Sequence, residues 1–111
     1  MNLETSPQGT DAIVIRCDGR LTMATAPALK AAVAATITDE RPRVVVDLTG
    51  IAFVDSSGLG ALVSGLKATR QAGGDLRIVG VGDQVRTVLS LTNLDRVLHP
   101  YDKIEDATHA W

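Results

Sequence analysis

Residues 44–60 read VVVDLTGIAFVDSSGLG and contain the strongest structural signal in the chain. Residues 44–48 are short, β-branched and almost continuously apolar, which is typical of a strand covered on both faces. A second short apolar stretch, 51–54, stops at Asp55, and an apolar stripe at helical spacing begins at Leu59. The segment therefore predicts a strand, a turn and a helix, in the order found in parallel α/β sheets.

The residues before this segment predict two strands and a helix. Residues 12–17 alternate between two faces and indicate a strand, and the turn-like residues 7–11 let residues 2–6 pair back on it as an edge strand. A helix is expected to begin near Thr25, its N-cap, with Pro27 in the first turn. One core-facing stripe supports this helix: Leu29, Ala32, Val33, Thr36 and Ile37.

After the segment, glycines and prolines divide the chain into short elements. Gly73 and Gly74 are expected to end the second helix. Residues 76–79 then predict a strand. Asp83 is a candidate N-cap for a short third helix, which Asn93 would close.

The last part of the chain predicts a strand and a helix. Residues 97–98 are expected to form the final, short strand. Asp102 and Glu105 have the spacing of a capping box, which would open a final helix with Ile104 and Ala107 facing inward.

This order predicts the α/β fold class. We expect one domain over residues 1–111, with a mixed, mostly parallel sheet of four to five strands and about four helices. The first two strands form a hairpin, which makes the sheet mixed.

The composition excludes several classes of function. Hydrophobic residues make up 45% of the chain and charged residues 22%, which is ordinary for a globular domain. The formal charge is 11 − 13 = −2, so a basic surface for direct binding of nucleic acid is not indicated. One Phe, one Tyr and one Trp do not suggest a base-stacking platform.

The sequence carries no signal for a membrane or for export. The N-terminal residues lack the basic and apolar regions of a signal peptide, and no apolar run approaches the roughly 20 residues that span a bilayer. Cys17 is the only cysteine, which excludes an internal disulfide and fits a reducing compartment. We therefore expect a cytoplasmic protein with no membrane partner.

Asp55, Ser56 and Ser57 stand where a turn enters a helix, and two interpretations of them are open. In the first, these side chains simply cap the helix. In the second, a hydroxyl here accepts a phosphate of about −1.5 to −2 charge. The helix end would favour that charge by about 0.3–1 kcal/mol, while Asp55 would repel it. The fold would then survive a modification that blocks a partner.

The segment around these residues resembles a known family. Residues 44–60, together with residues 19–27 (GRLTMATAP), are similar to the STAS domain, and specifically to bacterial anti-sigma factor antagonists, over roughly residues 3–110. The resemblance implies that Ser57 is the phosphate acceptor. The unphosphorylated form would bind an anti-sigma factor and release a sigma factor, and phosphorylation would abolish that binding.

The resemblance also implies the partners. The anti-sigma factor is a serine protein kinase that modifies Ser57, and a separate serine phosphatase removes the phosphate. The free protein is expected to be a monomer. The residues expected to contact the partner are Asp55, Ser56, Gly58, Leu59, Thr22 and Met23.

The first loop departs from the family pattern. The family usually has acidic residues there, as in Gly-Glu-Ile-Asp, whereas this chain has Arg20 and Thr22. Arg20 is open to three interpretations: it pairs with the phosphate, it marks a different partner, or it is a solvated surface charge. Ser56 is either a second acceptor or a capping residue, and Asp47 is expected to accept hydrogen bonds in a turn.

Two other functions compete with this one. An enzyme with Ser57 as nucleophile would need a base, but the Gly-x-Ser-x-Gly elbow is absent and His99 and His109 lie near the C-terminus. We therefore expect no catalytic residues, no metal site and no cofactor. The alternative within the family is a constitutive STAS interaction module of a stressosome or lipid-transport complex, for which phosphorylation of Ser57 in cells is the discriminating feature.

Overall fold

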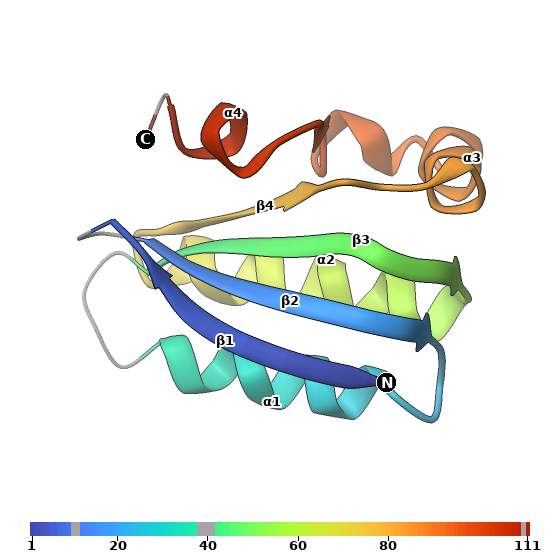
Figure 1. Cartoon of the computed structure of the whole chain (residues 1–111), viewed down its shortest axis with the longest axis horizontal. Helices are drawn as coiled ribbons and strands as arrows, with labels where there is room; N and C mark the ends of the chain where they lie inside the picture. Colours follow the sequence, from blue (N-terminus) through green and yellow to red (C-terminus); the bar gives the residue numbers. More distant parts are fainter. Residues whose placement is uncertain (10–11, 38–41, 110) are drawn as a thin grey trace.

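A five-stranded sheet in the order β1-β2-β3-β4-β5 is the centre of the computed structural model, which describes residues 1–9, 12–37, 42–109 and 111 (Figure 1). β1 is antiparallel to β2, and the other neighbours are parallel. This confirms the predicted mixed, mostly parallel α/β sheet. The strands are β1 Asn2–Gln8, β2 Ala12–Leu21, β3 Arg43–Val54, β4 Asp75–Val79 and β5 Pro100–Tyr101.

Four α-helices and one short 3-10 helix accompany the sheet in the described part of the chain. Figure 1 shows α1 and α2 on one side of the sheet, and α3 and α4 beyond β4. The turn expected over residues 7–11 falls partly outside the described residues, at Thr10 and Asp11. The helices are α1 Ala26–Thr36, α2 Ser56–Gln71, α3 Asp83–Leu91, η1 Leu94–Arg96 and α4 Ile104–Thr108.

The first part of strand β3, residues 44–46, is buried on both faces, as its apolar run predicts. Val44 and Val46 belong to the main core, in which Leu29 of α1 and Leu62 of α2 pack against the sheet. Val45 points to the opposite face, where a smaller cluster includes Ala107 of α4. Water is excluded from both sides of residues 44–46, which explains why this part of the strand is continuously apolar.

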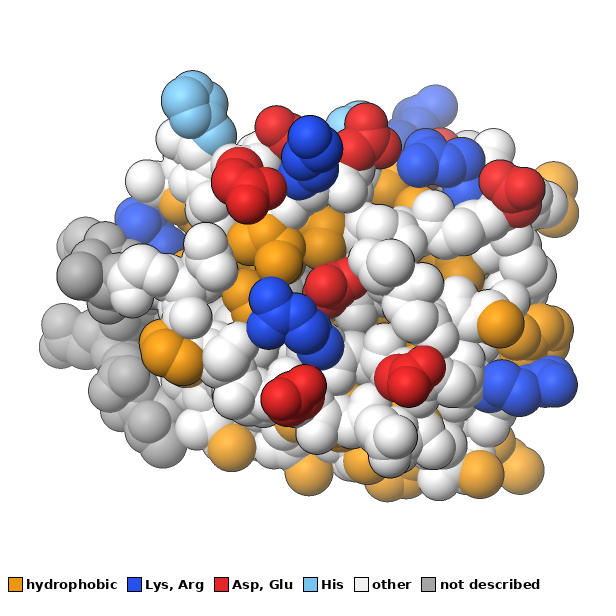
Figure 2. Space-filling model, in the orientation of Figure 1, with side chains coloured by type: hydrophobic (Ala, Val, Ile, Leu, Met, Phe, Trp, Pro, Cys, Tyr) orange, Lys and Arg blue, Asp and Glu red, His pale blue; other side chains and the backbone are white. Residues whose placement is uncertain are grey.

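The sheet face away from α1 and α2 is polar apart from the area that α4 covers. Figure 2 shows acidic and basic side chains scattered over this face around a small apolar area. Arg16 of β2 lies 3.8 Å from Asp47 of β3 and donates a hydrogen bond to Ser6 of β1. The opposite charges are mixed, so this face has no broad patch of one sign.

The second apolar stretch, 51–54, continues the strand expected over residues 44–48, and both belong to one strand, β3. β2 also continues further than predicted, to Leu21, and pairs with β3 as far as Val54. The β2–β3 ladder shifts register twice, between Arg16 and Asp18 and between Gly19 and Arg20, because β3 has one more residue than β2 in each interval. Pairing with a neighbouring strand therefore decides the length of β3, and the sequence of β3 alone does not reveal it.

Two expectations for the later helices need correction, and one is confirmed. Gly82, not Asp83, is the N-cap of α3, and Asp83 lies in the first turn. Lys103, not Asp102, is the N-cap of α4, so the predicted capping box is not formed. Asn93 does follow the end of α3 in a left-handed conformation, with φ 58°.

The expected strand at residues 97–98 is wrong. The N–H groups of Val97 and Leu98 donate to the carbonyl of Leu94, at 3.1 and 2.8 Å, and so continue the turn of η1. The last strand is β5, Pro100–Tyr101, which pairs with β4. Burial of Leu98 in the main core explains its apolar character without a strand.

Arg77 of β4 fastens the C-terminal segment to the sheet. Its guanidinium donates a 2.6 Å hydrogen bond to the carbonyl of Ala107. The same group lies 4.4 Å from the ring centroid of Trp111 and 5.8 Å from that of Tyr101. A cation between two aromatic rings and a carbonyl holds α4 against the face that includes Val45 and Val79.

We expect Arg77→Ala to loosen α4. The change removes a charge-assisted hydrogen bond and a cation–π contact, which together stabilise the docked segment by about 2 kcal/mol. Trp111 is the only tryptophan, so its fluorescence maximum should shift to longer wavelength. Arg86→Ala removes an exposed arginine of α3 and is the matched control. An unshifted maximum in Arg77→Ala would contradict this role.

Candidate functional site

Asp55 joins the β2–α1 loop to the start of α2. It is the N-cap of α2, and its Oδ1 accepts a 2.8 Å hydrogen bond from the Gly58 N–H. Its Oδ2 accepts a 3.0 Å hydrogen bond from the Met23 N–H. The Asp55 N–H donates to the carbonyl of Leu21 at 3.2 Å. One residue therefore fixes three chain segments at the end of the sheet.

These hydrogen bonds lower the pKa of the Asp55 carboxyl. The Gly58 N–H has the largest effect, and the Met23 N–H acts in the same direction, while burial opposes both. Donors that point at the charged form favour it. The carboxylate is therefore ionised at neutral pH, and negative charge is present beside Ser57 before any modification.

The loop before α1 is held by its own hydrogen bonds. The Thr25 hydroxyl donates to the Arg20 carbonyl at 2.7 Å and accepts from the Thr22 N–H at 2.8 Å. Thr25 is the N-cap of α1 by position, as expected, but its side chain fastens the loop and does not cap the helix. This fixed loop presents Met23 to solvent, with 75% of its surface exposed.

The serines occupy the first turn of α2. Ser56 is its first residue and is exposed, and Ser57 follows and is half-buried. Because the Asp55 carboxylate caps the helix, neither hydroxyl is needed for that purpose. The two interpretations of the motif thus apply to different residues. Asp55 caps the helix, and Ser57 remains the candidate phosphate acceptor.

Gly58 and Leu59 are buried at the same junction. A Cβ atom at Gly58 would overlap the carbonyl oxygen of Leu21 and would lie 2.8 Å from Val54 Cγ2. Leu59 is only 7% exposed and packs in the main core. The partner contact expected for Leu59 stays a prediction that its burial does not favour.

Gln84 completes the end of β3, a contact that was not predicted from the sequence. Its Oε1 accepts from the Val54 N–H at 2.9 Å, and its Nε2 donates to the Val54 carbonyl at 3.0 Å. β4 has already ended beside Asp47, so this side chain replaces a neighbouring strand. A glutamine at the second position of a helix has no local pattern that would reveal this contact.

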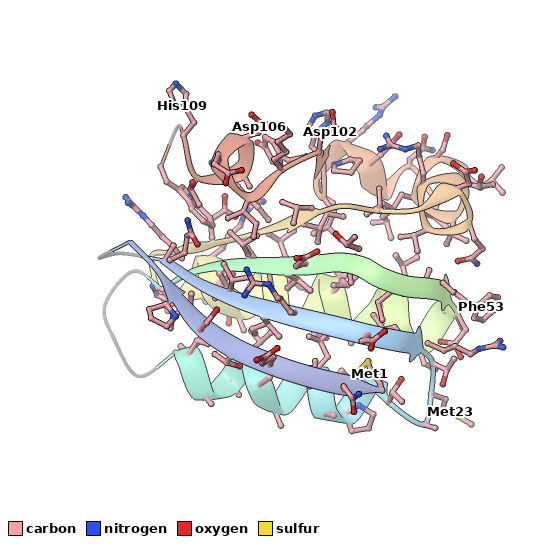
Figure 3. All side chains as sticks on the ribbon, in the orientation of Figure 1. Met1, Met23, Phe53, Asp102, Asp106 and His109 are labelled. Atoms are coloured by element: carbon pink, nitrogen blue, oxygen red, sulfur yellow. The ribbon has the colours of Figure 1, made fainter. Side chains whose placement is uncertain are left out.

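Arg20 stacks on Phe53 at the same end of the sheet. Its guanidinium carbon lies 4.6 Å from the ring centroid, and the two residues are partners in the β2–β3 ladder. Figure 3 shows Phe53 and Met23 at this end of the molecule. The stack holds Arg20 more firmly than solvent would, and its pairing with a phosphate stays a prediction.

Asp47 has the structural role expected of it. Its Oδ1 accepts from the Thr49 N–H at 3.0 Å and from the Thr49 hydroxyl at 2.6 Å. This hydrogen-bonded turn lies within β3, seven residues before Val54. It helps to shape the strand that leads to Asp55, and its polar partners among the described residues are Thr49 and Arg16.

The histidines lie away from Ser57. His99 packs edge-on against Tyr101 of β5. Tyr101 is the ladder partner of Val79 in β4, and Val79 is the ladder partner of Asp47 in β3. From Asp47 to Val54 the strand advances about 23 Å, at roughly 3.3 Å per residue. His109 lies at the opposite end of the molecule from Phe53 (Figure 3). Neither imidazole is placed to serve as a base for Ser57.

The other chemical groups fit structural roles. Cys17 is buried in the main core, and burial, with a smaller effect of Asp47, raises the pKa of its thiol to about 12. Within residues 1–9, 12–37, 42–109 and 111, no group of three or more His, Cys, Asp or Glu side chains is arranged to hold a metal ion. None of the helices described is both long and apolar enough to cross a membrane.

The chain belongs to the STAS domain family, whose model matches residues 4–107. The anti-sigma-B factor antagonist of Staphylococcus aureus is 30% identical over 99 residues, which cover 89% of this chain and 91% of that protein. Relatives from Thermotoga neapolitana and Thermotoga maritima are 37% and 38% identical over 65 residues, which cover 59% of this chain and only 58% of each relative.

A solved structure agrees with the assignment. The anti-sigma factor antagonist of Mycobacterium paratuberculosis has a TM-score of 0.82 and 30% identity, and the match covers 98% of this chain and 93% of that one. The family membership and the α/β sheet expected from the sequence are both confirmed.

We expect Gly58→Ala to destabilise the protein by about 1–3 kcal/mol or more, because the new Cβ overlaps backbone that cannot move freely. Gly60→Ala is the matched control on the same helix, since a Cβ there meets nothing within 4 Å. The control should stabilise the protein by up to about 1 kcal/mol, through helix propensity. Urea unfolding measures both, and equal effects would refute the close approach at Gly58.

A second prediction concerns pH. The lowered pKa of Asp55 means that its stabilising effect is complete above the unfolded value, about 3.9, and is lost as pH falls through the lower folded value. The difference in unfolding free energy between wild type and Asp55→Asn should be largest near neutral pH and should shrink in acid. Gly60→Ala, which changes no titratable group in the same helix, should show no such trend. A pH-independent difference for Asp55→Asn would contradict the assignment.

Proposed function

We propose that this protein is an anti-sigma factor antagonist switched by phosphorylation of Ser57. In the proposal, the unphosphorylated form binds an anti-sigma factor and so releases a sigma factor. One observation carries it: Ser57 is half-buried in the first turn of α2, and Asp55 does the capping in its place. The hydroxyl is therefore available for chemistry that the fold does not require.

The surface around Ser57 supports a protein partner. Met23 is 75% exposed and is held beside α2 by its hydrogen bond to Asp55. Ser56, which follows Asp55, is exposed, and Thr22 is half-buried in the same fixed loop as Met23. An exposed apolar side chain on a rigid loop suits burial under a partner. We include Thr22, Met23, Asp55 and Ser56 in this surface. The contact expected for Gly58, like that of Leu59, is not favoured by its burial.

A phosphate on Ser57 would act on the partner more than on the fold. The start of α2 favours the added charge by about 0.3–1 kcal/mol, and the Asp55 carboxylate opposes it. A partner that covers the same residues must desolvate a dianion, which costs several kcal/mol. A loss of about 2.7 kcal/mol already weakens binding roughly 100-fold.

The remaining roles follow from the same proposal. The anti-sigma factor is the serine protein kinase for Ser57, and a serine phosphatase reverses the modification. The site acts by binding and has no catalytic role, which agrees with the placement of His99 and His109 away from Ser57. The protein would act in the cytoplasm, as one domain over residues 1–111, and would be a monomer until its partner binds.

Binding to purified Ser57 variants tests the proposal. Beads that carry Ser57→Ala should retain, from lysate of the native host, a protein that mass spectrometry identifies as a serine kinase. Ser57→Asp should retain it roughly 100-fold less well, because the carboxylate must be desolvated at the interface. Ser64→Asp adds the same charge at an exposed position further along α2 and should bind normally.

Equal retention by Ser57→Ala and Ser57→Asp would refute the switch and favour a constitutive interaction module. Phosphorylation of purified wild-type protein by the captured kinase, followed by mass spectrometry of the modified peptide, then tests the acceptor. Phosphate on Ser56 in place of Ser57 would overturn the assignment of the residue.

A further inference from the structure

A polar hollow of about 210 Å³ lies beside β4, far from Ser57. Arg70 from the last turn of α2, Arg77 from β4 and Arg96 from η1 line it, with His99 and Tyr101. Ser57 and Arg70 stand at opposite ends of α2, about 20 Å apart at 1.5 Å per residue. The hollow is therefore separate from the surface proposed for the anti-sigma factor.

The hollow is positively charged although the chain is acidic. The whole chain has a formal charge of −2. Three arginines and one aspartate, Asp75, line the hollow, so its formal charge is 3 − 1 = +2 with His99 neutral. The three ion pairs found among the described residues do not involve Arg96.

Asp75 orients two of the arginines, and its carboxylate has little capacity left to accept further hydrogen bonds. Its Oδ1 accepts from Arg70 Nε at 3.1 Å and from the Leu76 N–H at 2.9 Å. Its Oδ2 lies 3.5 Å from Arg77 Nε. Both guanidinium groups are thus held at Nε. The terminal NH₂ groups of Arg70 remain as donors.

Arg77 gives this hollow a rigid wall. Its side chain is 19% exposed, and it is held by the Ala107 carbonyl and by the rings of Trp111 and Tyr101. One of its terminal nitrogens donates a hydrogen bond to the Ala107 carbonyl, and the other remains as a donor for a ligand. A charged group that is held in place before a ligand arrives loses little entropy on binding.

We propose that this hollow binds a small anion through a phosphate group. Guanidinium groups pair with phosphate through two parallel hydrogen bonds, and a phosphate monoester carries about −1.5 to −2 charge at neutral pH, which matches the +2 of the lining. The volume is below the roughly 300–1,000 Å³ of pockets for larger ligands. The ligand is therefore inorganic phosphate or a small phosphate monoester. This inference does not depend on the proposed function of Ser57.

Nuclear magnetic resonance titration of the full chain tests the site. Sodium phosphate, added at ionic strength matched with sodium chloride, should produce saturable shifts at Arg96, His99 and the Arg70 side chain, with a Kd on the order of 1 mM. A parallel titration with glycerol phosphate distinguishes a phosphate monoester from inorganic phosphate as the ligand. Tighter binding of the ester indicates a phosphorylated metabolite, and tighter binding of phosphate indicates the free ion.

Variants at exposed arginines decide whether the site is built. Arg96→Gln should weaken phosphate binding roughly tenfold, because it removes a charged donor. Arg86→Gln makes the same change on α3, outside the hollow, and should bind as wild type does. Arg70→Gln is a second test within the hollow. Absence of saturable shifts with either ligand, or equal weakening by Arg96→Gln and Arg86→Gln, would overturn the proposal.

Discussion

Two backbone N–H groups, from Met23 and Gly58, share the carboxylate of Asp55. These bonds bring the loop after β2 and the first turn of α2 to one place, and Gly58 lets the helix approach Leu21 without a side chain between them. The change from strand to helix takes place at this junction, because β3 ends there and α2 begins. Ser57 is positioned by contacts made by its neighbours, which leaves its own hydroxyl unused by the fold.

The sequence predicted the parts of the fold that depend on local pattern. Burial on both faces made residues 44–48 recognisable as an inner strand, and the stripe from Leu59 revealed α2. The structure differs where distant partners decide the outcome. β3 is one strand because β2 pairs with it up to Val54, and residues 97–98 belong to a turn because their N–H groups reach Leu94. No local pattern contains these contacts.

The candidate site was predictable to a similar degree. Carboxylate and hydroxyl groups at a helix start drew attention to Asp55 and Ser57 from the sequence alone. Gln84 was not predictable, because its contact with Val54 joins residues 30 positions apart. Burial of Leu59 was implied by its own helical stripe, yet the family resemblance placed it on the partner surface. The arginines of the hollow come from three separate elements, and only the fold brings them together.

α2 connects two regions of different character. Its first turn carries Ser57 beside a carboxylate, and its last turn carries Arg70 beside two other arginines. Between them, one face of the helix packs in the core through Leu62 and Leu66. The two ends are therefore held at a fixed separation by a rigid element, and a ligand at one end need not disturb the other.

The burial of Cys17 has a practical consequence for work on this protein. It is the only cysteine, and a thiol with a pKa of about 12 has almost no reactive thiolate at neutral pH. A cysteine introduced at Met23, where 75% of the side chain is exposed, would be the one site that reacts with a maleimide dye. A single fluorophore can thus be attached beside Ser57 while the native cysteine stays in place.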